Sequence, residues 1–301
     1  MFKKNNKQWS IAVYKYMDGL ANDVLISNYS ANQTKKKGIE FIADPFLLKN
    51  DGLYYVIFEY LNSWKGNGEI GYAESTNLID WSYKGTILKK PYHISYPYII
   101  KSENHYYMVP ETSANNDIQI YKAVSFPSKW KYLMKLMEGK PFKDTSIFYY
   151  DQYWWMFTTY DNKNLHLYYS SKLLSDRWTK HPQSPVLSGR YARPGGSILF
   201  YKNKILRFSQ DSVPNYGTKL VAFEIKELNA KKYCEHIYSE RYPFLNPGGS
   251  GWNSERMHHI DFLLDGNKLY AAVDGYSNEK DNRILILLMR AIRFLRRKIN
   301  I

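Results

Sequence analysis

The stretches ADPFLL, residues 43–48, and YYVIFE, residues 54–59, set the pattern from which the fold follows. Asp44 lies at the start of the first stretch, and Glu59 closes the second one fifteen residues later. The turn sequence NDG between them makes the two stretches a predicted β-hairpin. An antiparallel hairpin places the start of its first strand beside the end of its second. We therefore expect Asp44 and Glu59 to be neighbours at one end of the hairpin.

The same pair of positions recurs in four more places with the same spacing of fifteen residues. These pairs are Tyr96 with Glu111, Asp144 with Thr159, Gly196 with Asp211, and His259 with Asp274. The opening positions are separated by 52, 48, 52 and 63 residues. Self-similarity at roughly 40 to 50 residues, with four strands per unit, is typical of a β-propeller. The pattern predicts an all-β fold, a five-bladed β-propeller, in which ten paired positions converge on one face. Two stacked sheets are the weaker alternative.

The remaining strands of each blade follow the hairpins. Third strands are predicted in EIGYAES, DIQIYKA, LHLYYSS and KLVAFEI, and fourth strands follow Trp81, Trp130 and Trp178, which we expect to pack between blades. In the fifth copy, RILILL (residues 283–288) is expected as the third strand. The N-terminal run QWSIAVYKY (residues 8–16) is then expected as the missing fourth strand. Such closure removes exposed sheet edges.

Composition favours one globular domain. Aromatic residues make up 17% of the 301 residues, and residues 1–289 hold no linker or low-complexity stretch, so they are the predicted propeller. No window offers the roughly 18 uncharged apolar residues of a spanning helix. The N-terminal sequence has no apolar core of signal-peptide length, and the single cysteine, Cys234, excludes an intramolecular disulfide. These features predict a cytoplasmic protein.

The net charge of +14 comes from 42 basic and 28 acidic residues and favours anionic partners. No nucleic-acid-binding motif is present, so nucleic acid is not an expected partner. Residues 290–301 form a predicted short basic amphipathic helix, whose basic residues alternate with Ile292, Phe294, Leu295 and Ile299. Such a helix can lie on an anionic membrane surface, which would place the protein at the inner membrane face. Docking on the propeller's own flank or on a second subunit are the alternatives.

The six acidic residues among the paired positions need an explanation, because Glu and Asp are poor strand formers. Carboxyl groups gathered in a cleft can divide into acid and base roles. Carboxylates also accept hydrogen bonds from sugar hydroxyls, and nearby aromatic side chains such as Tyr96 and Trp155 can cover sugar rings. The alternative is that some acids, notably Glu59 and Asp274, only tie one blade to the next.

Several short phrases carry a resemblance to known families: FIADPF, GEIGYAES, HISYPYI, YMVPET, DTSIF, WWMFTT, ARPGG, RFSQD and MHHID. The chain resembles glycoside hydrolases of the arabinanase and β-xylosidase type. It is more similar to the N-terminal propeller domain of plant glucosamine inositolphosphorylceramide transferases, whose bacterial relatives stand alone or are fused to formyltransferase-like domains. The resemblance to the hydrolases implies that Asp44 is a general base and that Asp144 orients and tunes the acid.

The fourth blade departs from the hydrolase pattern. The hydrolases carry their general acid, a glutamate, on the innermost strand of this blade, but here the strand reads ARPGGSI without a carboxylate. Glu111 or Asp211 can substitute only in a rearranged site. Arg193 stands in this segment and is suited to bind phosphate. With His259 nearby, it suggests a phosphorylated donor, either a nucleotide-sugar or a lipid-linked sugar. The alternative is that Arg193 pairs with Asp144 or Asp211.

Adjacent histidines on a strand point to opposite faces, so only His259 of the pair His258–His259 is expected to reach the channel. Their spacing matches no known metal motif, and neither a metal nor another cofactor is expected. The predicted function is sugar transfer in the biosynthesis of a bacterial surface polysaccharide or glycolipid. The alternatives are a glycoside hydrolase and a non-catalytic glycan-binding module that serves a partner transferase. The expected catalytic residues are Asp44, Asp144 and Glu111, and the expected substrate-binding residues are Arg193, His259, Asp211, Glu59, Tyr96, Asp274 and Trp155.

Overall fold

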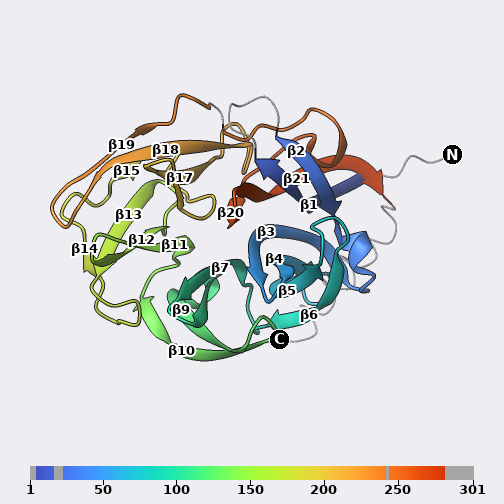
Figure 1. The fold of residues 1–301 in the computed structure, drawn as a ribbon, viewed down its shortest axis with the longest axis horizontal. Coiled ribbons are helices and arrows are strands. Elements are labelled where there is room, and N and C mark those ends of the chain that lie inside the picture. Colours follow the sequence, from blue (N-terminus) through green and yellow to red (C-terminus); the bar gives the residue numbers. More distant parts are fainter. Residues whose placement is uncertain (1–4, 17–22, 242–243, 282–301) are drawn as a thin grey trace, which may run out of the picture.

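A computed structural model describes residues 5–16, 23–241 and 244–281 of the chain. Its strands form five antiparallel sheets around a common axis, each with four strands on its main path (Figure 1). This confirms the predicted five-bladed β-propeller. The predicted strand at residues 283–288 and the predicted helix at residues 290–301 lie outside the described residues.

The first three blades follow the chain in order. Blade 1 contains β3 (Ile39–Asn50), β4 (Leu53–Asn62), β5 (Asn67–Ser75) and β6 (Ser82–Leu88). Blade 2 contains β7 (Ser95–Ser102), β8 (His105–Thr112), β9 (Asp117–Ser125) and β10 (Lys129–Glu138). Blade 3 contains β11 (Lys143–Tyr150), β12 (Tyr153–Thr159), β13 (Asn164–Ser170) and β14 (Thr179–Lys180), and β15 (Leu187–Ser188) also pairs with β13.

Blade 4 contains β16 (Leu199–Tyr201), β17 (Lys204–Asp211), β18 (Lys219–Leu228) and β19 (Tyr233–Ile237). Blade 5 contains β20 (Ile260–Asp265), β21 (Lys268–Asp281), β1 (Asn5–Tyr16) and β2 (Val24–Tyr29). The helices of the described part are the 3₁₀ segments η1 (Ala31–Thr34), η2 (Ser113–Asn115) and η3 (Gly251–Asn253). None of them is long and apolar enough to cross a membrane.

The N-terminal strand closes the ring, as predicted, but at a different position in the blade. β1 pairs directly with β21, with Ile11 opposite Asp274 and Tyr16 opposite Leu269. β1 is therefore the third strand of blade 5, and β2 is the fourth. The expectation that residues 8–16 form the fourth strand was wrong, because the order of strands within a sheet is set by pairing and not by strand propensity.

The five inner hairpins have two-residue turns, which lie on the face opposite the paired positions. Asp51 and Gly52 join β3 to β4 with φ values of 49° and 79°, and Lys202 and Asn203 join β16 to β17 with φ values of 48° and 61°. Positive φ at both central residues is the type I′ geometry that matches the twist of the flanking strands. These tight turns fix the register of each hairpin and hence the place of the paired residues.

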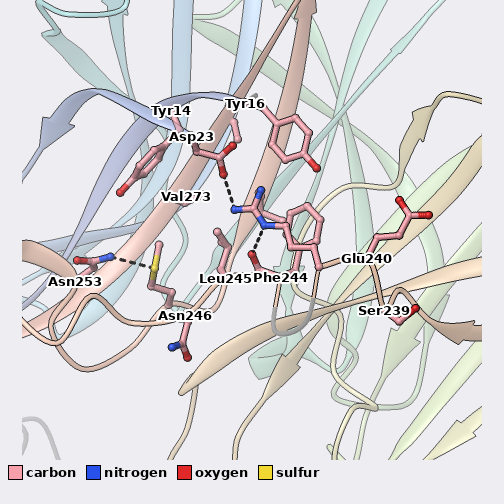
Figure 2. Close-up of a pocket in the computed structure, with 14 residues that line it drawn as sticks. Tyr14, Tyr16, Asp23, Ser239, Glu240, Phe244, Leu245, Asn246, Asn253 and Val273 are labelled. Atoms are coloured by element: carbon pink, nitrogen blue, oxygen red, sulfur yellow. Dashed lines mark hydrogen bonds and ion pairs between the residues drawn. The ribbon is translucent and has the colours of Figure 1, made fainter. Parts of the chain in front are cut away.

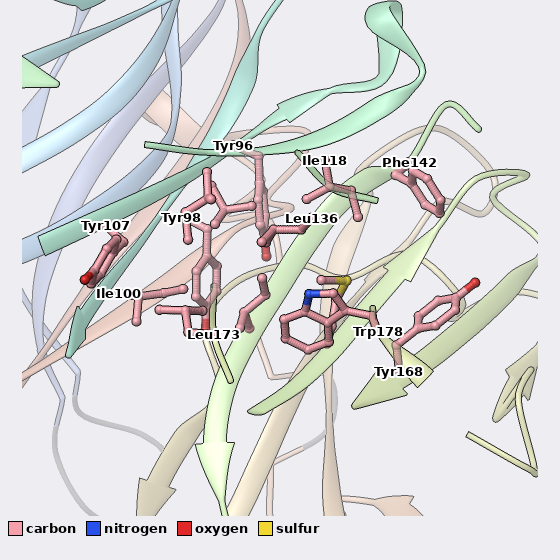
Figure 3. Packing of buried hydrophobic residues seen from close by; sticks show 14 of the residues in the cluster. Tyr96, Tyr98, Ile100, Tyr107, Ile118, Leu136, Phe142, Tyr168, Leu173 and Trp178 are labelled. Carbon is pink, nitrogen blue, oxygen red and sulfur yellow. The ribbon is translucent and has the colours of Figure 1, made fainter. Parts of the chain in front are cut away.

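The blades pack through buried side chains. Figure 3 shows the cluster between blades 2 and 3, which includes Tyr98, Leu136 and Trp178. Trp178 is buried there, while the half-buried Trp81 and Trp130 pack against clusters around blades 1 and 2. The prediction that these three tryptophans pack between blades is confirmed.

The long segment that connects β19 to β20 forms backbone hydrogen bonds with both blade 4 and blade 5. The carbonyl of Leu245 accepts a hydrogen bond of 3.0 Å from the amide of Leu220 in β18. The amide of Glu255 donates a 3.0 Å hydrogen bond to the carbonyl of Tyr276 in β21. This extra packing between two blades accounts for the longest of the repeat separations.

Candidate functional site

The paired positions meet as the sequence predicts. Glu59 lies opposite Ala43, Glu111 opposite Ser95, and Thr159 opposite Lys143. In each case the partner directly precedes the opening residue of the pair. The six acids therefore converge from five blades at one end of the propeller.

The opening residues of three blades share an unusual backbone conformation. Asp44, Tyr96 and Asp144 have φ values of 50°, 43° and 46°, in the left-handed region that few non-glycine residues adopt. At each one the pairing register shifts by one residue, which is a β-bulge. Bulges redirect side chains, and backbone strain of this kind is concentrated at functional sites. Three equivalent bulges turn the opening residues toward the axis.

The amides at these bulges donate to carboxylates of neighbouring blades. The amide of Asp44 donates to Asp274 over 3.2 Å, and the amide of Tyr96 donates to Asp44 over 3.2 Å. The amide of Asp144 donates to Glu111 over 3.1 Å. The acids thus connect blade 5 to blade 1, blade 1 to blade 2, and blade 2 to blade 3. Both expected roles of the acids coexist, because the same carboxyl groups line the site and link the blades.

The fourth copy has no carboxylate because its opening position has no room for a side chain. A Cβ atom on Gly196, whose φ is +145°, would lie 1.8 Å from the carbonyl oxygen of Ile260. This close approach is part of the contact between blades 4 and 5, where the amide of Ser197 donates to the Ile260 carbonyl over 3.2 Å. The carbonyl of Gly196 also accepts 2.9 Å hydrogen bonds from Tyr96 and Ser146.

Two residues that are predicted to contact the substrate have fully buried side chains, so the structure adds no support to that prediction. Tyr96 is 0% exposed, and its ring lies on the axis 5.4 Å from the ring of Phe46, below the acids. Trp155 is also 0% exposed and packs between blades 3 and 4, where its indole donates to the Tyr150 carbonyl over 2.9 Å. Tyr96 forms the floor of the site, and Trp155 belongs to the core.

Three of the six acids are paired with cations and sealed from solvent. Asp144 accepts a hydrogen bond from Arg193, which establishes the predicted structural pairing of that arginine. Asp211 pairs with Arg190 over 2.7 Å, and Asp274 lies 2.7 Å from Nδ1 of His258. Their side chains are 3%, 0% and 0% exposed. Burial opposes the ionisation of Asp144 and Asp274, but Arg193 and His258 outweigh it, so both carboxyl groups have lowered pKa values.

The other three acids face the opening without a full countercharge. The side chains of Asp44, Glu59 and Glu111 keep exposures of 9%, 8% and 8%. Burial, together with neighbouring carboxylates, raises the pKa of Asp44 to about 7 and that of Glu111 to about 8. Burial and the charge of Asp44 also raise the pKa of Glu59 well above its usual range. The carboxyl groups of blades 1 and 2 are therefore protonated more readily than usual, while Asp144 and Asp274 in blades 3 and 5 favour the ionised form.

Both adjacent histidines approach Asp44, which corrects the expectation that only His259 reaches the channel. Nε2 of His258 and Nδ1 of His259 lie 3.9 Å and 3.8 Å from Oδ1 of Asp44. The expectation failed because β20 begins at Ile260, so the two residues precede the strand and do not alternate. Burial lowers the pKa of His259 to about 4, whereas the carboxylates of Asp274 and Asp44 overcome burial and raise the pKa of His258.

The predicted residues do not account for the whole site. His93 was missed: its Nδ1 accepts a 2.9 Å hydrogen bond from the amide of Gly68, and its Nε2 lies 3.4 Å from Glu59. Arg190 and Tyr216 were missed as well. All three lie outside the repeated pair positions, so the spacing that revealed the acids gave no signal for them.

Asp44, His258 and Asp274 are the described residues in which ligand atoms for a metal ion come together, within 4.8 Å of one another. The distance of 2.7 Å between Nδ1 of His258 and Oδ2 of Asp274 is that of an ion pair. The geometry is therefore that of a histidine held between two carboxylates. The expectation that the chain binds no metal stays a prediction.

Two cavities lie away from the acids. One, of about 580 Å³, lies between blades 4 and 5 and is lined by Tyr14, Arg241 and Phe244 among others (Figure 2). The other, of about 430 Å³, is lined by Leu47, Tyr98 and Leu263 at the end of the axis below Tyr96. Neither is lined by any of the six acids.

Comparison with known proteins identifies the family that the sequence matches. Residues 6–276 match the family described as "Glucosamine inositolphosphorylceramide transferase 1, N-terminal". The chain is 32% identical over 247 residues to the glucosamine inositolphosphorylceramide transferase 1 of Oryza sativa subsp. japonica, covering 78% of this chain and 33% of the rice protein. It is 30% identical over 247 residues to the protein of that name from Arabidopsis thaliana, covering 78% and 32%. The chain thus spans about a third of these relatives.

Two solved structures with the same fold are glycosidases. The arabinohexaose complex of α-L-arabinanase from Cellvibrio cellulosa superposes with a TM-score of 0.55 at 14% identity, covering 78% of this chain and 91% of that one. The catalytic domain of an α-L-arabinofuranosidase from Coprinopsis cinerea gives a TM-score of 0.56 at 12% identity, covering 77% and 90%. At these identities the likeness establishes the propeller fold alone.

Proposed function

We propose a function from the premise that this chain belongs to the family of the N-terminal part of glucosamine inositolphosphorylceramide transferase 1. The protein acts on a glycosidic bond of a carbohydrate and uses Glu111 as the general acid and Asp44 as the base. Because the chain spans about a third of its curated relatives, their whole activity is not transferred to it. The proposal rests on the chemistry of the described site.

The observation that supports it is the division of the acids into two groups. Glu111 has a pKa raised to about 8 by burial and by Asp144, so it holds a proton that it can give to a leaving-group oxygen. Asp44 has a pKa raised to about 7, so near neutral pH a good fraction of it is ionised and can accept a proton. Environments that separate the pKa values of paired carboxyl groups are how such sites assign acid and base.

In the proposed reaction, a hydroxyl group attacks the anomeric carbon as Asp44 takes its proton. The bond from that carbon to the leaving oxygen breaks, and this oxygen receives the proton of Glu111. The ionised Asp144 stays paired with Arg193 and keeps a negative charge beside the carbon as positive charge develops there. The attacking hydroxyl belongs to water in hydrolysis and to a sugar or lipid acceptor in transfer.

Sugar transfer in surface polysaccharide or glycolipid biosynthesis remains the biosynthetic form of this proposal. A phosphorylated donor has weaker support, because Arg193 and His258 are both paired with buried carboxylates, Asp144 and Asp274. A cytoplasmic location and a membrane contact through residues 290–301 also remain proposals, as does the absence of nucleic acid among the partners.

The test combines substrates with matched variants. We would incubate the protein with aryl glycosides, with and without acceptor sugars, and separately with nucleotide-sugars. Glu111→Gln and Asp44→Asn should each lower turnover by at least about 100-fold, the usual scale of acid–base catalysis. Asp265→Asn, which removes a carboxylate paired with Lys49 on the opposite face, should leave turnover unchanged. Glycan binding without turnover in the wild type would instead support the binding-module function.

A further inference from the structure

Tyr216 lies at the edge of the acid cluster in the loop between β17 and β18. The residue is 42% exposed, although the ring is held on two sides. The guanidinium carbon of Arg193 lies 5.0 Å from the ring centroid, and the ring of His258 meets it nearly perpendicularly at 5.2 Å and 86°. The hydroxyl group of Tyr216 makes no hydrogen bond to any residue in the described part of the chain. Tyr216 therefore has a ring that is fixed by its neighbours but partly exposed, and its hydroxyl group has no hydrogen-bond partner in the described part of the chain.

The position of this ring follows from contacts that lead back to the acids. Asp144 holds Arg193 through a hydrogen bond, and Arg193 in turn supports the ring of Tyr216. Next to it, Gly217 has a φ of +65°, and a Cβ there would lie 2.9 Å from the Cβ of His258. The two groups that hold the ring also reach the proposed acid and base: Nη2 of Arg193 lies 3.7 Å from Glu111, and Nε2 of His258 lies 3.9 Å from Asp44.

An exposed ring beside proton-donating and proton-accepting carboxyl groups has a specific chemical use. The faces of a sugar ring present C–H groups that pack on aromatic rings, while its hydroxyl groups need polar partners at the side. The ring of Tyr216 supplies the first, and the carboxyl groups beside it supply the second. The charge of Arg193 beneath the ring is balanced by Asp144, so this surface suits an uncharged ligand.

We propose that Tyr216 is the platform on which the reacting sugar ring lies, and that this sugar is uncharged with one face of C–H groups. This inference rests on the proposed function and names the kind of sugar for the same site. In this role Asp144 is also a positioning residue, because it fixes the arginine on which the platform rests. The opposing possibility is that Tyr216 only covers Arg193.

The experiment compares Tyr216→Ala, Tyr216→Phe and Tyr216→Trp in the full chain. The probes are a panel of immobilised uncharged pyranosides and furanosides, used for binding, and the corresponding aryl glycosides, used for KM and kcat. Tyr216→Ala should weaken glycoside binding and raise KM by about tenfold, with a smaller effect on kcat. Tyr216→Phe and Tyr216→Trp should stay within about threefold of the wild type, because both keep the ring face. Tyr149→Ala, which removes an exposed tyrosine (54%) from the opposite face, is the control and should change nothing.

The outcomes separate the two proposals. If Tyr216→Ala binds and turns over glycosides like the wild type, the platform is wrong and the proposed function stands. If Tyr216→Phe loses as much binding as Tyr216→Ala, the hydroxyl and not the ring face is the contact, and the platform is again wrong. If the wild type neither binds nor converts any probe, the proposed function fails and takes the platform with it.

Discussion

Gly196 shows how a single backbone contact limits the chemistry of a repeat. The carbonyl of Ile260 occupies the space where a side chain would begin, so this copy cannot carry the acid that other positions carry. We predict that Gly196→Ala destabilises the protein by about 3 kcal/mol or more. Gly85→Ala is the matched control, because Gly85 has the same φ of +145° and a Cβ added there would meet no atom within 4 Å. Urea unfolding of both variants separates the steric contact from the strain of the backbone. Equal losses in the two would contradict the explanation.

The raised pKa values of Asp44 and Glu111 predict a narrow pH optimum for the proposed reaction. Activity should rise as Asp44 loses its proton near pH 7 and fall as Glu111 loses its proton near pH 8. The measurement is kcat/KM for an aryl glycoside from pH 5 to pH 10. Glu111→Gln should abolish the alkaline limb along with most of the rate. A wild-type profile that stays flat between pH 6 and pH 9 would rule out these two groups as the acid and the base.

The raised pKa of Glu111 should also make the free energy of unfolding depend on pH. Its pKa in the folded state is raised to about 8, so the folded protein binds more protons than the unfolded chain between the ordinary glutamate pKa and pH 8. The stabilising contribution of Glu111 to the free energy of unfolding is therefore fully present below about pH 4 and is lost as the pH rises through 8. Glu111→Gln, which cannot ionise, should unfold at a higher temperature than the wild type at pH 8.5 and lose this advantage at pH 5. Glu138→Gln, at a side chain 69% exposed, should show no such pH dependence.

At the scale of elements, the inner hairpins could be predicted because alternating apolar residues and two-residue turns are local signals. The bulges at Asp44, Tyr96 and Asp144 could not, because a residue enters the left-handed region here only when neighbouring blades supply acceptors for its amide. The place of β1 in blade 5 was missed for a similar reason. A strand's propensity does not say which edge it will pair with.

Tyr96 joins three blades, and its hydroxyl is the element-scale prediction. It bonds with Ser146 of blade 3 over 2.8 Å and with the carbonyl of Gly196 in blade 4 over 2.9 Å. Tyr96→Phe leaves these buried partners without the hydroxyl and should cost about 1 to 3 kcal/mol of unfolding free energy. Tyr132→Phe, at a tyrosine 44% exposed on β10, should cost almost nothing. Urea denaturation measures the free energy of unfolding of both variants. If both lose a similarly small amount, the hydrogen bonds of Tyr96 to blades 3 and 4 contribute little to stability.

Across the whole molecule, the sequence pattern predicted which acids meet. It did not predict which of them have raised pKa values and which have lowered ones. Asp44 and Glu111 have raised pKa values while Asp144 and Asp274 have lowered ones, and the difference comes from cations such as Arg193 and His258. These cations come from segments outside the repeated positions. Spacing within a repeat therefore predicts the ring of acids, whereas the charge on each member depends on contacts between blades.

The closure of the ring links the N-terminal strand to the site. β1 pairs with β21 from Tyr16 to Asn5, and the ring of Trp9 stacks on His258 at 4.1 Å and 20°. Without β1 the long strand β21 would be an open edge, and His258 would lose its aromatic cover. We predict that a chain lacking residues 1–16 unfolds at much lower urea concentration and self-associates. A synthetic peptide of residues 5–16 added in trans should restore both stability and site chemistry, while a scrambled peptide should restore neither. If the shortened chain unfolds at the same urea concentration as the wild type, the pairing of β1 with β21 contributes little to stability.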